Sequence, residues 1–391
     1  MSKHALRGTS AVSRAYSIED LRRLARERLP RAVFDFFDGG AEDEITLRAN
    51  REAFERVCLA PKVLNDVSDI DTTATILGVP SQLPIVIAPT GAVGFGWRGG
   101  DLAIARAAAQ AGIPYTLSTT ATASIEGIAN EAPGRLWFQA YVLRKREFTF
   151  SLIERARQAG YEALVITVDL PVGGKRERDF RNDFSIPFRY THRNLLDFAR
   201  RPVWALEMLL RGIPVMENLI GYTAEATSAA AIASSVGGNY DPSFDWDSLK
   251  AMRDGWPRKL IVKGVTRPED AERLAALGCD AIVVSNHGGR QLDGGVATAD
   301  ALPAIARAVG SRVDVLVDGG IRRGRDVVKA LALGARAVMI GRATLYGACA
   351  GGEAGAARAI TILRDELERS MRLCGVRSVR DIAADLLAPA R

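Results

Sequence analysis

Short apolar segments rich in Val, Ile and Leu recur from about residue 84 onward, and each is followed by small or polar residues and then by a segment of helical periodicity. This alternation predicts strands connected by helices. The strands are apolar without regular alternation, as in parallel sheets buried on both faces. Eight of them favour an α/β fold of the (β/α)8, or TIM-barrel, type over an open doubly wound sheet. The expected strands are IVIAP (85–89), YTLS (115–118), LWFQAY (136–141), ALVITVD (163–169), LIVKG (260–264), AIVVSNHGG (281–289), VDVLVDGG (313–320) and AVMIGR (337–342).

Further segments flank this predicted barrel. Ser17 and Asp20 resemble a capping box that begins one helix, and a second helix is expected to end at Gly39 and Gly40. About 90 residues separate the fourth and fifth strands, far more than the other connections use, which predicts an insertion. We expect one domain over 1–391. It comprises an N-terminal helical segment and lead-in (17–83), the barrel (84–350) with an insertion at 180–245, and C-terminal helices (351–391).

Composition and charge restrict the class of protein. Hydrophobic residues make up 48% and charged residues 25%, which excludes collagen-like, coiled-coil and largely disordered chains. The net charge of 52 − 46 = +6 comes from scattered residues, so nucleic acid is not an expected partner, whereas anionic small molecules are. The four cysteines form no C-x-x-C pair, so we expect no metal site and no disulfide framework. The first sixteen residues lack the apolar core of a signal peptide, which favours the cytoplasm.

Chemistry in such barrels gathers where the strands end. All eight expected strand ends carry polar residues or glycine, and although any one of them could simply form a turn, the set predicts a binding site. These residues are Pro89, Thr90, Gly91, Ser118, Gln139, Tyr141, Thr167, Asp169, Lys263, Ser285 to Arg290, Asp318, Gly319, Gly320, Gly341 and Arg342.

The densest cluster of such residues is SNHGGRQLD (285–293). His287 stands at a strand end with Arg290 three residues later, so a general base and an anion-binding fork could face one ligand. The alternative is a buried histidine satisfied by a hydrogen bond. The other two histidines, His4 and His192, are expected to be exposed to solvent.

A second cluster follows the last two strands, where DGGIRRG (318–324) and Gly341-Arg342 combine backbone N–H groups with arginine charge. Barrels commonly bind phosphate at this position, and ordinary turns with solvated arginines are the alternative. The segment GFGWRG also fits the dinucleotide pattern G-x-G-x-x-G. We reject this interpretation, because its first glycine lies several residues beyond the strand and no acid ends the next strand.

From about residue 17 to 380 the chain resembles the FMN-dependent α-hydroxyacid dehydrogenase and oxidase family. The motifs that carry the resemblance are DGGAEDE (38–44), IAPTG (87–91), WFQAY (137–141), TVD (167–169), KRERDFRNDF (175–184), VKG (262–264), SNHGGRQLD (285–293) and DGGIRRG (318–324). The segments GGKRERD (173–179), DPSFDWDSLKAMRDGWP (241–257) and GRATLYG (341–347) are most similar to the (S)-mandelate dehydrogenase branch, and L-lactate dehydrogenases share several of them.

The resemblance implies that FMN lies across the mouth of the barrel. Contacts to its isoalloxazine and ribityl parts would come from Pro89, Thr90, Gly91, Ser118, Gln139, Thr167, Lys263 and Ser285, and contacts to its ribityl and phosphate end from Asp318, Gly319, Gly320, Arg322, Gly341 and Arg342. Lys263 has a clear electrostatic task there, because a cation beside N1 and the C2 carbonyl stabilises the negative charge of reduced flavin.

For the substrate, the resemblance implies that Arg176 and Arg290 bind the carboxylate, that Tyr141 hydrogen-bonds near the hydroxyl, and that His287 removes a proton while Asp169 stabilises the imidazolium. Whether this proton comes from carbon or from the hydroxyl stays open. One departure concerns Phe36, because the family usually has a tyrosine there whose hydroxyl helps to bind the carboxylate. The missing hydrogen bond favours an aryl or otherwise bulky substrate.

The expected reaction is oxidation of an (S)-2-hydroxy acid, mandelate or a related aryl compound, to the 2-oxo acid, with a quinone-type electron acceptor. Gly91, where glycolate oxidases usually have alanine, favours dehydrogenase over oxidase. An L-lactate dehydrogenase, an oxidase that produces hydrogen peroxide, and a barrel that only binds a phosphorylated ligand are the alternatives. Residues 190–220 are basic and apolar, which fits either peripheral docking on the inner face of the cell membrane or a lid over the barrel. The family often forms homo-oligomers, and we expect the same of this chain.

Overall fold

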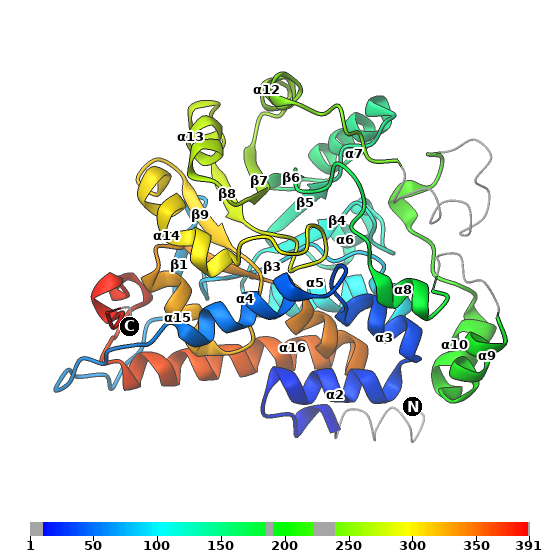
Figure 1. The fold of residues 1–391 in the computed structure, drawn as a ribbon, viewed down its shortest axis with the longest axis horizontal. Helices are drawn as coiled ribbons and strands as arrows, with labels where there is room; N and C mark the ends of the chain where they lie inside the picture. The colour runs from blue at the N-terminus through cyan, green and yellow to red at the C-terminus, as the bar shows by residue number, and fades with distance from the viewer. Residues whose placement is uncertain (1–10, 185–190, 223–238, 390–391) are drawn as a thin grey trace.

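The eight expected strands close into a parallel barrel. This computed structural model describes residues 11–184, 191–222 and 239–389. In the barrel the strands are hydrogen-bonded in the order β10-β3-β4-β5-β6-β7-β8-β9, which confirms the predicted α/β barrel (Figure 1). Their bounds are β3 (Ile85–Ile87), β4 (Tyr115–Ser118), β5 (Leu136–Ala140), β6 (Ala163–Thr167), β7 (Lys259–Val265), β8 (Ala281–Val284), β9 (Asp314–Val317) and β10 (Ala337–Ile340). Several predicted segments extended past these ends, because their last residues belong to the loops that form the site.

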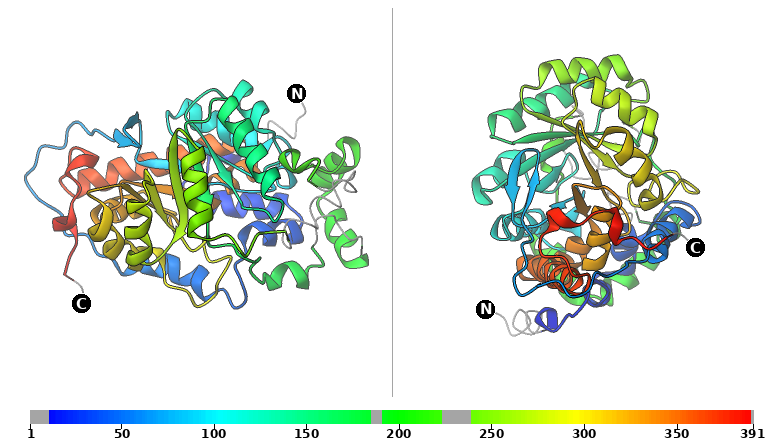
Figure 2. Two further views of the ribbon diagram at one scale, coloured as in Figure 1. Left: turned by 90° about the horizontal axis from the view of Figure 1, so that it is seen from above. Right: turned by 90° about the vertical axis from the view of Figure 1, so that its left-hand side faces the viewer.

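Helices surround the barrel on its outside, as the two views of Figure 2 show. The helices that follow successive strands are α5 (Gly100–Gln110), α6 (Ile125–Glu131), α7 (Arg146–Gln158), α12 (Trp246–Gly255), α13 (Pro268–Ala276), α14 (Thr298–Val309), α15 (Gly324–Ala332) and α16 (Arg342–Leu373). Helix α16 is kinked at Gly351 and Gly352, which have non-helical backbone angles, so the expected boundary at residue 350 falls on this kink. The division of the chain into segments stays a prediction.

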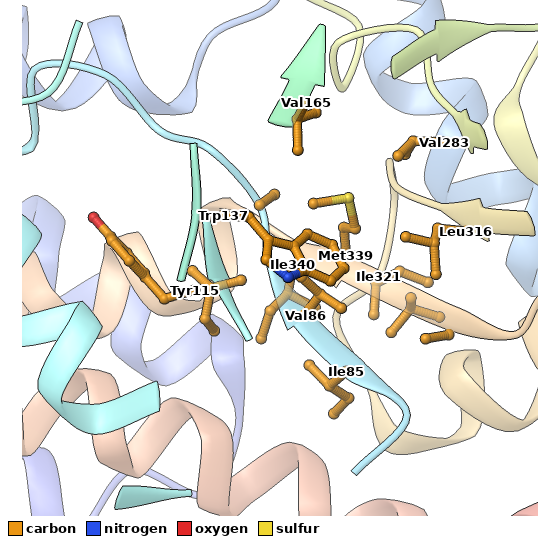
Figure 3. Close-up of a cluster of buried hydrophobic side chains, with 14 of the residues drawn as sticks. Ile85, Val86, Tyr115, Trp137, Val165, Val283, Leu316, Ile321, Met339 and Ile340 are labelled. Atoms are coloured by element: carbon orange, nitrogen blue, oxygen red, sulfur yellow. The ribbon is translucent and has the colours of Figure 1, made fainter. Parts of the chain in front are cut away.

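Bulky side chains fill the inside of the barrel. Trp137 lies at the centre of this cluster with Val86 and Met339 close to it (Figure 3), and all three are at most 1% exposed. A filled interior leaves no channel through the barrel. Ligands therefore have to bind at the open ends of the strands.

The N-terminal helices lie beside the barrel, as predicted. They are α2 (Ile18–Arg28), α3 (Arg31–Asp38) and α4 (Ile45–Arg56). Ser17 caps α2 by accepting a hydrogen bond from the Asp20 N–H at 3.1 Å. A short antiparallel hairpin of β1 (Ala74–Ile76) and β2 (Val79–Ser81) follows them.

The long connection between β6 and β7 contains most of the predicted insertion. Its elements are α8 (Glu177–Arg181), α9 (His192–Ala199), α10 (Pro202–Arg211) and the 3-10 turn η2 (Glu217–Leu219). Helices α9 and α10 project from one side of the barrel next to α3 and α8 (Figure 1). Trp204 of α10 anchors them, because its ring is 2% exposed and its Nε1 donates to the Phe95 carbonyl at 2.8 Å.

Candidate active site

A cavity of about 490 Å3 opens at the carboxyl ends of the barrel strands. Its wall contains the catalytic and substrate-binding candidates Tyr141, Arg176, His287, Arg290 and Phe36, together with the cofactor candidates Pro89, Thr90, Gly91, Lys263, Asp318, Gly319, Gly320, Arg322, Gly341 and Arg342. The structure thus brings together residues that are up to about 300 positions apart in the sequence. The roles assigned to them stay predictions.

Four cofactor candidates lie behind the wall and not in it. Gln139 connects two of them, since its Oε1 accepts from the Ser118 hydroxyl at 3.1 Å and its Nε2 donates to the Thr167 hydroxyl at 3.0 Å. Ser285 is fully buried and accepts a hydrogen bond from Lys263 at 2.7 Å. Ser118, Gln139, Thr167 and Ser285 thus form a hydrogen-bonded polar layer directly behind the cavity wall.

His287 lies between a carboxylate and a phenol. Its Nδ1 is 3.0 Å from Oδ1 of Asp169, and its Nε2 is 3.3 Å from the Tyr141 hydroxyl. Because a carboxylate can only accept, Nδ1 carries the proton and Nε2 of the neutral ring is free to accept one. Burial by itself raises the pKa of Asp169, but the charge of His287 in its protonated form, the hydrogen bond from its Nδ1 and the charge of Lys263 outweigh burial and hold that pKa below its usual value.

The backbone around His287 explains the sequence of this loop. His287 has a φ of 58°, and the two residues after it also have positive φ, at 62° and 75°. Glycine adopts this region without steric cost, whereas a non-glycine residue there is strained. A Cβ on Gly289 would lie 2.5 Å from the Leu47 backbone nitrogen. The tight left-handed turn therefore requires the glycine pair and aims the imidazole into the cavity wall.

Lys263 places a buried positive charge at the end of β7. Its side chain is 4% exposed, and Nζ lies 3.0 Å from Oδ2 of Asp318. Burial opposes the charged ammonium, but the charges of Asp318 and Asp169 prevail and raise the pKa of Lys263. The lysine is therefore a permanent cation at neutral pH. The other buried oxygen of Asp318, Oδ1, has no hydrogen-bond partner within the described residues.

Two arginines of the cavity wall lie over the ring of Phe36. The guanidinium carbons of Arg176 and Arg290 lie 5.6 and 5.5 Å from the ring centre. Arg176 is held by Asp179, with Nε and Oδ2 3.1 Å apart. Burial and the neighbouring charges of Arg176 and Arg342 lower the pKa of Arg290 to about 9. An anionic ligand would relieve this repulsion, so the pair is suited to a carboxylate.

The N-terminal segment closes one side of the site. The carbonyl of Gly39 accepts hydrogen bonds from Arg290 at 2.7 Å and from Arg342 at 2.8 Å. Arg342 also donates to the carbonyls of Phe37 and Gly288. Its guanidinium therefore ties helix α3 to the His287 loop while its charge stays in the cavity wall.

The expected phosphate end of the site combines glycines with a half-buried arginine. Gly319 and Gly320 both have a φ of 88°, and a Cβ on Gly320 would lie 2.2 Å from the Asn50 carbonyl oxygen. Arg322 is directed over the ring of Tyr346 at 5.8 Å and has no carboxylate partner within the described residues. Burial lowers its pKa. A half-buried guanidinium without a carboxylate partner in the described part of the chain, next to the left-handed turn at Gly319 and Gly320, fits a bound phosphate.

Sequence reasoning missed several residues of the cavity wall. Tyr240 packs on Tyr141 with ring centres 5.2 Å apart, and Met216 and Phe184 also line the cavity. Tyr240 and Met216 belong to the insertion. No sequence pattern near them indicates that this part of the chain packs against the barrel. Asp179 follows Arg176 by three residues, a spacing at which side chains on a helix can pair, and this spacing was the signal available in the sequence for that ion pair.

The remaining sequence observations concern other places. In GFGWRG, a Cβ on Gly96 would lie 2.3 Å from the Cys349 sulfur, so the glycine serves close packing. His192 is exposed, as predicted, and His4 lies outside the described residues. Within the residues that the structure describes, no group of three or more His, Cys, Asp or Glu could hold a metal ion. No described helix is long and apolar enough to cross a membrane.

Comparison with known proteins gives a consistent result. The family model described as FMN-dependent dehydrogenase matches residues 25–389. The chain is 42% identical to (S)-mandelate dehydrogenase of Pseudomonas putida over 95% of its own length and 93% of that protein. It is 44% identical to L-lactate dehydrogenase of Caulobacter vibrioides over 95% and 97% of the two chains.

Solved structures agree with these relatives. The crystal structure of the monotopic membrane protein (S)-mandelate dehydrogenase superposes with a TM-score of 0.93 at 42% identity, covering 96% of this chain and 99% of that one. A mandelate oxidase superposes with a TM-score of 0.81 at 38% identity, covering 96% and 98%.

Proposed function

The chain belongs to the FMN-dependent dehydrogenase family and is an FMN-dependent 2-hydroxy acid dehydrogenase, and from this premise we propose that its substrate is an (S)-2-hydroxy acid with an aryl side chain, mandelate or a close relative. Mandelate and L-lactate dehydrogenases are similar to it at nearly equal identity, so overall similarity does not choose between them. The composition of the cavity favours the aryl substrate.

The observation that carries this proposal is the apolar surface beside the two arginines. Phe36, Phe184, Tyr240 and Met216 line the cavity together with Leu170. Phe36 packs on Phe184 with ring centres 4.9 Å apart. A phenyl group would bury its faces against these side chains, at about 25 cal/mol per Å2 of apolar area. The methyl group of lactate would leave much of that surface in water.

The residues of the cavity fit FMN. Arg322 and the glycine turn at Gly319 and Gly320 suit its phosphate, and the unpartnered Oδ1 of Asp318 suits a ribityl hydroxyl. Lys263 would place its positive charge beside the flavin ring. When bound, FMN supplies the acceptor for the two electrons that leave the substrate. Gly91 packs directly against Thr120, because a Cβ there would lie 2.1 Å from Oγ1 of Thr120.

The chain itself performs the binding and the proton transfer. Arg176 and Arg290 bind the substrate carboxylate, which fixes the carbon that carries the hydroxyl group in front of His287. Nε2 of His287 accepts a proton from the substrate, and Asp169 stabilises the resulting imidazolium through the 3.0 Å contact to Nδ1. Tyr141 donates to the substrate oxygen. The products are the 2-oxo acid and the reduced cofactor.

We assign a quinone-type compound as the electron acceptor and the α9–α10 pair as the part that docks on a membrane. The pair presents leucines outward, and Leu209 and Leu210 are 81% and 73% exposed. Arginines flank them, as in segments that lie in a bilayer interface. The relative with the 0.93 TM-score is a monotopic membrane protein, which supports the same position for this chain.

The visible spectrum of the purified protein tests the substrate and acceptor together. Anaerobic addition of (S)-mandelate, L-lactate and glycolate should bleach the flavin at different rates, with (S)-mandelate fastest by kcat/KM. Faster reduction by L-lactate would refute the aryl assignment. Re-oxidation by a soluble quinone should outpace re-oxidation by oxygen, and the opposite order with stoichiometric hydrogen peroxide would identify an oxidase.

A further inference from the structure

The insertion returns toward the barrel through residues 212–222, which contain the short turn η2 (Glu217–Leu219). Met216 stands directly before this turn, lines the active-site cavity and is 7% exposed. A methionine side chain is flexible, so its position depends on how firmly its backbone is held. The contacts of the turn therefore decide where this part of the cavity wall lies.

Asn218 fastens the turn to the beginning of helix α6, and its side chain is fully buried. Its Oδ1 accepts a hydrogen bond from the Ile125 N–H at 3.0 Å, and its Nδ2 donates to the Ala123 carbonyl at 3.1 Å. The first of these bonds satisfies an N–H group that has no partner inside the helix. Both polar groups of the Asn218 amide are thus used to hold the turn.

Glu217 adds a bond to the same end of α6. Its Oε2 accepts from the Ser124 N–H at 2.9 Å, while the Ser124 hydroxyl caps the helix by accepting from the Gly127 N–H at 3.1 Å. The dipole of a helix also favours a carboxylate near its N-terminus. Two neighbouring side chains, Glu217 and Asn218, therefore bind the turn to α6, and we call them the η2 clasp.

The loop that receives the η2 clasp is itself part of the cavity wall. Residues 119–124 connect β4 to α6, and Thr120 of this loop lines the cavity together with Met216. The Ala92 N–H donates to the Thr120 carbonyl at 2.9 Å, which joins the loop to the cavity wall after β3. The clasp thus fixes Met216 relative to the ends of the strands, although Met216 belongs to the insertion.

The buried amide of Asn218 is a stronger anchor than the contacts at the ends of the segment. Arg98 donates to the Gly212 carbonyl at 2.8 Å, and Lys145 donates to the Tyr222 carbonyl at 3.1 Å. Water can replace these donors, because both side chains reach solvent. Loss of the Asn218 amide would instead leave a buried N–H group without a partner, which costs more than the loss of a surface hydrogen bond.

Resting on the proposed oxidation of an aryl 2-hydroxy acid, we propose that Asn218 is a positioning residue for substrate selection, which acts by holding Met216 against the side chain of the substrate. With the η2 clasp intact, Met216 completes the apolar surface that a phenyl group buries. When the clasp is lost, the phenyl group loses this contact. The methyl group of lactate loses less, because its apolar area is smaller.

The test is steady-state oxidation of (S)-mandelate and L-lactate by the full-length FMN-loaded enzyme, with a dye as acceptor. Asn218→Ala should lower the ratio of kcat/KM for (S)-mandelate over L-lactate by about tenfold, because a small loss of contact in an apolar pocket changes discrimination by about 10- to 200-fold. The change should lie mainly in KM for (S)-mandelate. Asn218→Asp retains the acceptor for the Ile125 N–H and is as good a cap as asparagine, so it should keep the ratio within about threefold of the wild type.

Met216→Ala removes the same contact and leaves the η2 clasp in place. It should lower the ratio by about tenfold, and its combination with Asn218→Ala should lower it by less than about twofold more, because residues that act through one contact are not additive. Glu217→Ala, at an exposed position, replaces Asn218→Ala in this comparison if that variant does not fold, and it should lower the ratio by about threefold. Full additivity with Met216→Ala would overturn the proposal.

Asn194 provides a matched control. It is another buried asparagine of the insertion, 3% exposed, and its Oδ1 accepts from the Thr191 N–H at 2.8 Å at the start of α9. In the described part of the chain, neither of these two residues belongs to the wall of the active-site cavity. Asn194→Ala should lower the melting temperature and change the substrate ratio by less than about twofold. Equal changes of the ratio in Asn194→Ala and Asn218→Ala would overturn the proposal.

The wild-type ratio separates this proposal from the function on which it rests. If the wild type prefers (S)-mandelate and Asn218→Ala leaves the ratio unchanged, the aryl substrate stands and the positioning role falls. If the wild type prefers L-lactate, the aryl substrate is refuted. The positioning role then stands only if Asn218→Ala still changes the ratio by about tenfold and Asn218→Asp restores it.

Discussion

Replacing Phe36 with tyrosine adds one hydroxyl group beside Arg176 and Arg290, the two arginines that we propose bind the substrate carboxylate. The ring of Phe36 is held on both sides, by Phe37 at 5.2 Å and by Phe184 at 4.9 Å between ring centres. The guanidinium carbons of Arg176 and Arg290 lie 5.6 and 5.5 Å from its centre. The tyrosine ring should therefore keep this position and point its hydroxyl into the cavity beside a bound carboxylate.

The expected gain follows from the strength of a hydrogen bond to a charged group, about 1.5–3 kcal/mol. Since 1.4 kcal/mol corresponds to a factor of ten in affinity, Phe36→Tyr should lower KM for (S)-mandelate by about 10- to 150-fold. The chemical step should change much less, because the carboxylate is bound in the ground state and the transition state alike.

The assay is steady-state oxidation with a dye acceptor, together with titration of the oxidised enzyme by the aryl 2-oxo acid product. Phe36→Leu is the control, because it removes the ring beneath both guanidinium groups and adds no hydroxyl. It should weaken binding, by about 0.5–2 kcal/mol for the lost cation–π contacts. An unchanged or higher KM in Phe36→Tyr would refute our placement of residue 36 beside the carboxylate.

Four further substitutions test other parts of the site and the fold. His287→Asn should lower kcat by about 10²- to 10⁴-fold with normal FMN content in the visible spectrum, and retained turnover would eliminate His287 as the base. Lys263→Met should lower the reduction potential of FMN, measured by redox titration, because the cation proposed to lie beside the flavin is lost; an unchanged potential would contradict that proposed contact. Gly320→Ala should cost about 1–3 kcal/mol of unfolding free energy and reduce FMN occupancy, because its φ is 88° and its Cβ would lie 2.2 Å from a carbonyl oxygen. Gly278→Ala, at a φ of 89° with open space around it, is the control, and an equal loss of FMN there would show that strain and not contact matters. Burial raises the pKa of Asp101 to about 6 although Thr122 donates to it, so the folded chain holds this proton more tightly than the unfolded chain and loses stability as pH rises from about 4 to 6. Asp101→Asn should flatten this part of the thermal stability profile, and identical profiles would show that Asp101 does not titrate there.

The local pattern of apolar and polar residues was sufficient to predict the barrel strands and the residues at their ends. Short segments such as YTLS and ALVIT, bounded by turns and alternating with helical segments, indicate buried strands, and the residue that follows such a strand is expected at the rim of the barrel. Lys263 and Asp318 were predicted on this basis, and the structure places them 3.0 Å apart. The resemblance to a known family then supplied the expected roles.

Other contacts depend on segments that have no local relation to one another. The Gly39 carbonyl that accepts from Arg290 and Arg342, and the Tyr240 ring on Tyr141, come from a helix before the barrel and from the far end of the insertion. Neither position differs in sequence from an ordinary loop residue.

The sequence by itself determined the barrel and the order in which chemical groups appear around its mouth, because side-chain periodicity fixes which residues are buried and where each strand ends. Only the tertiary structure decided which of these groups meet. Closure of the barrel and the return of the insertion brought Tyr240 to within 5.2 Å of Tyr141, measured between ring centres, and gathered His287, Arg290 and Phe36 in the wall of one cavity. Such distances depend on the packing of whole helices, which no short stretch of sequence encodes.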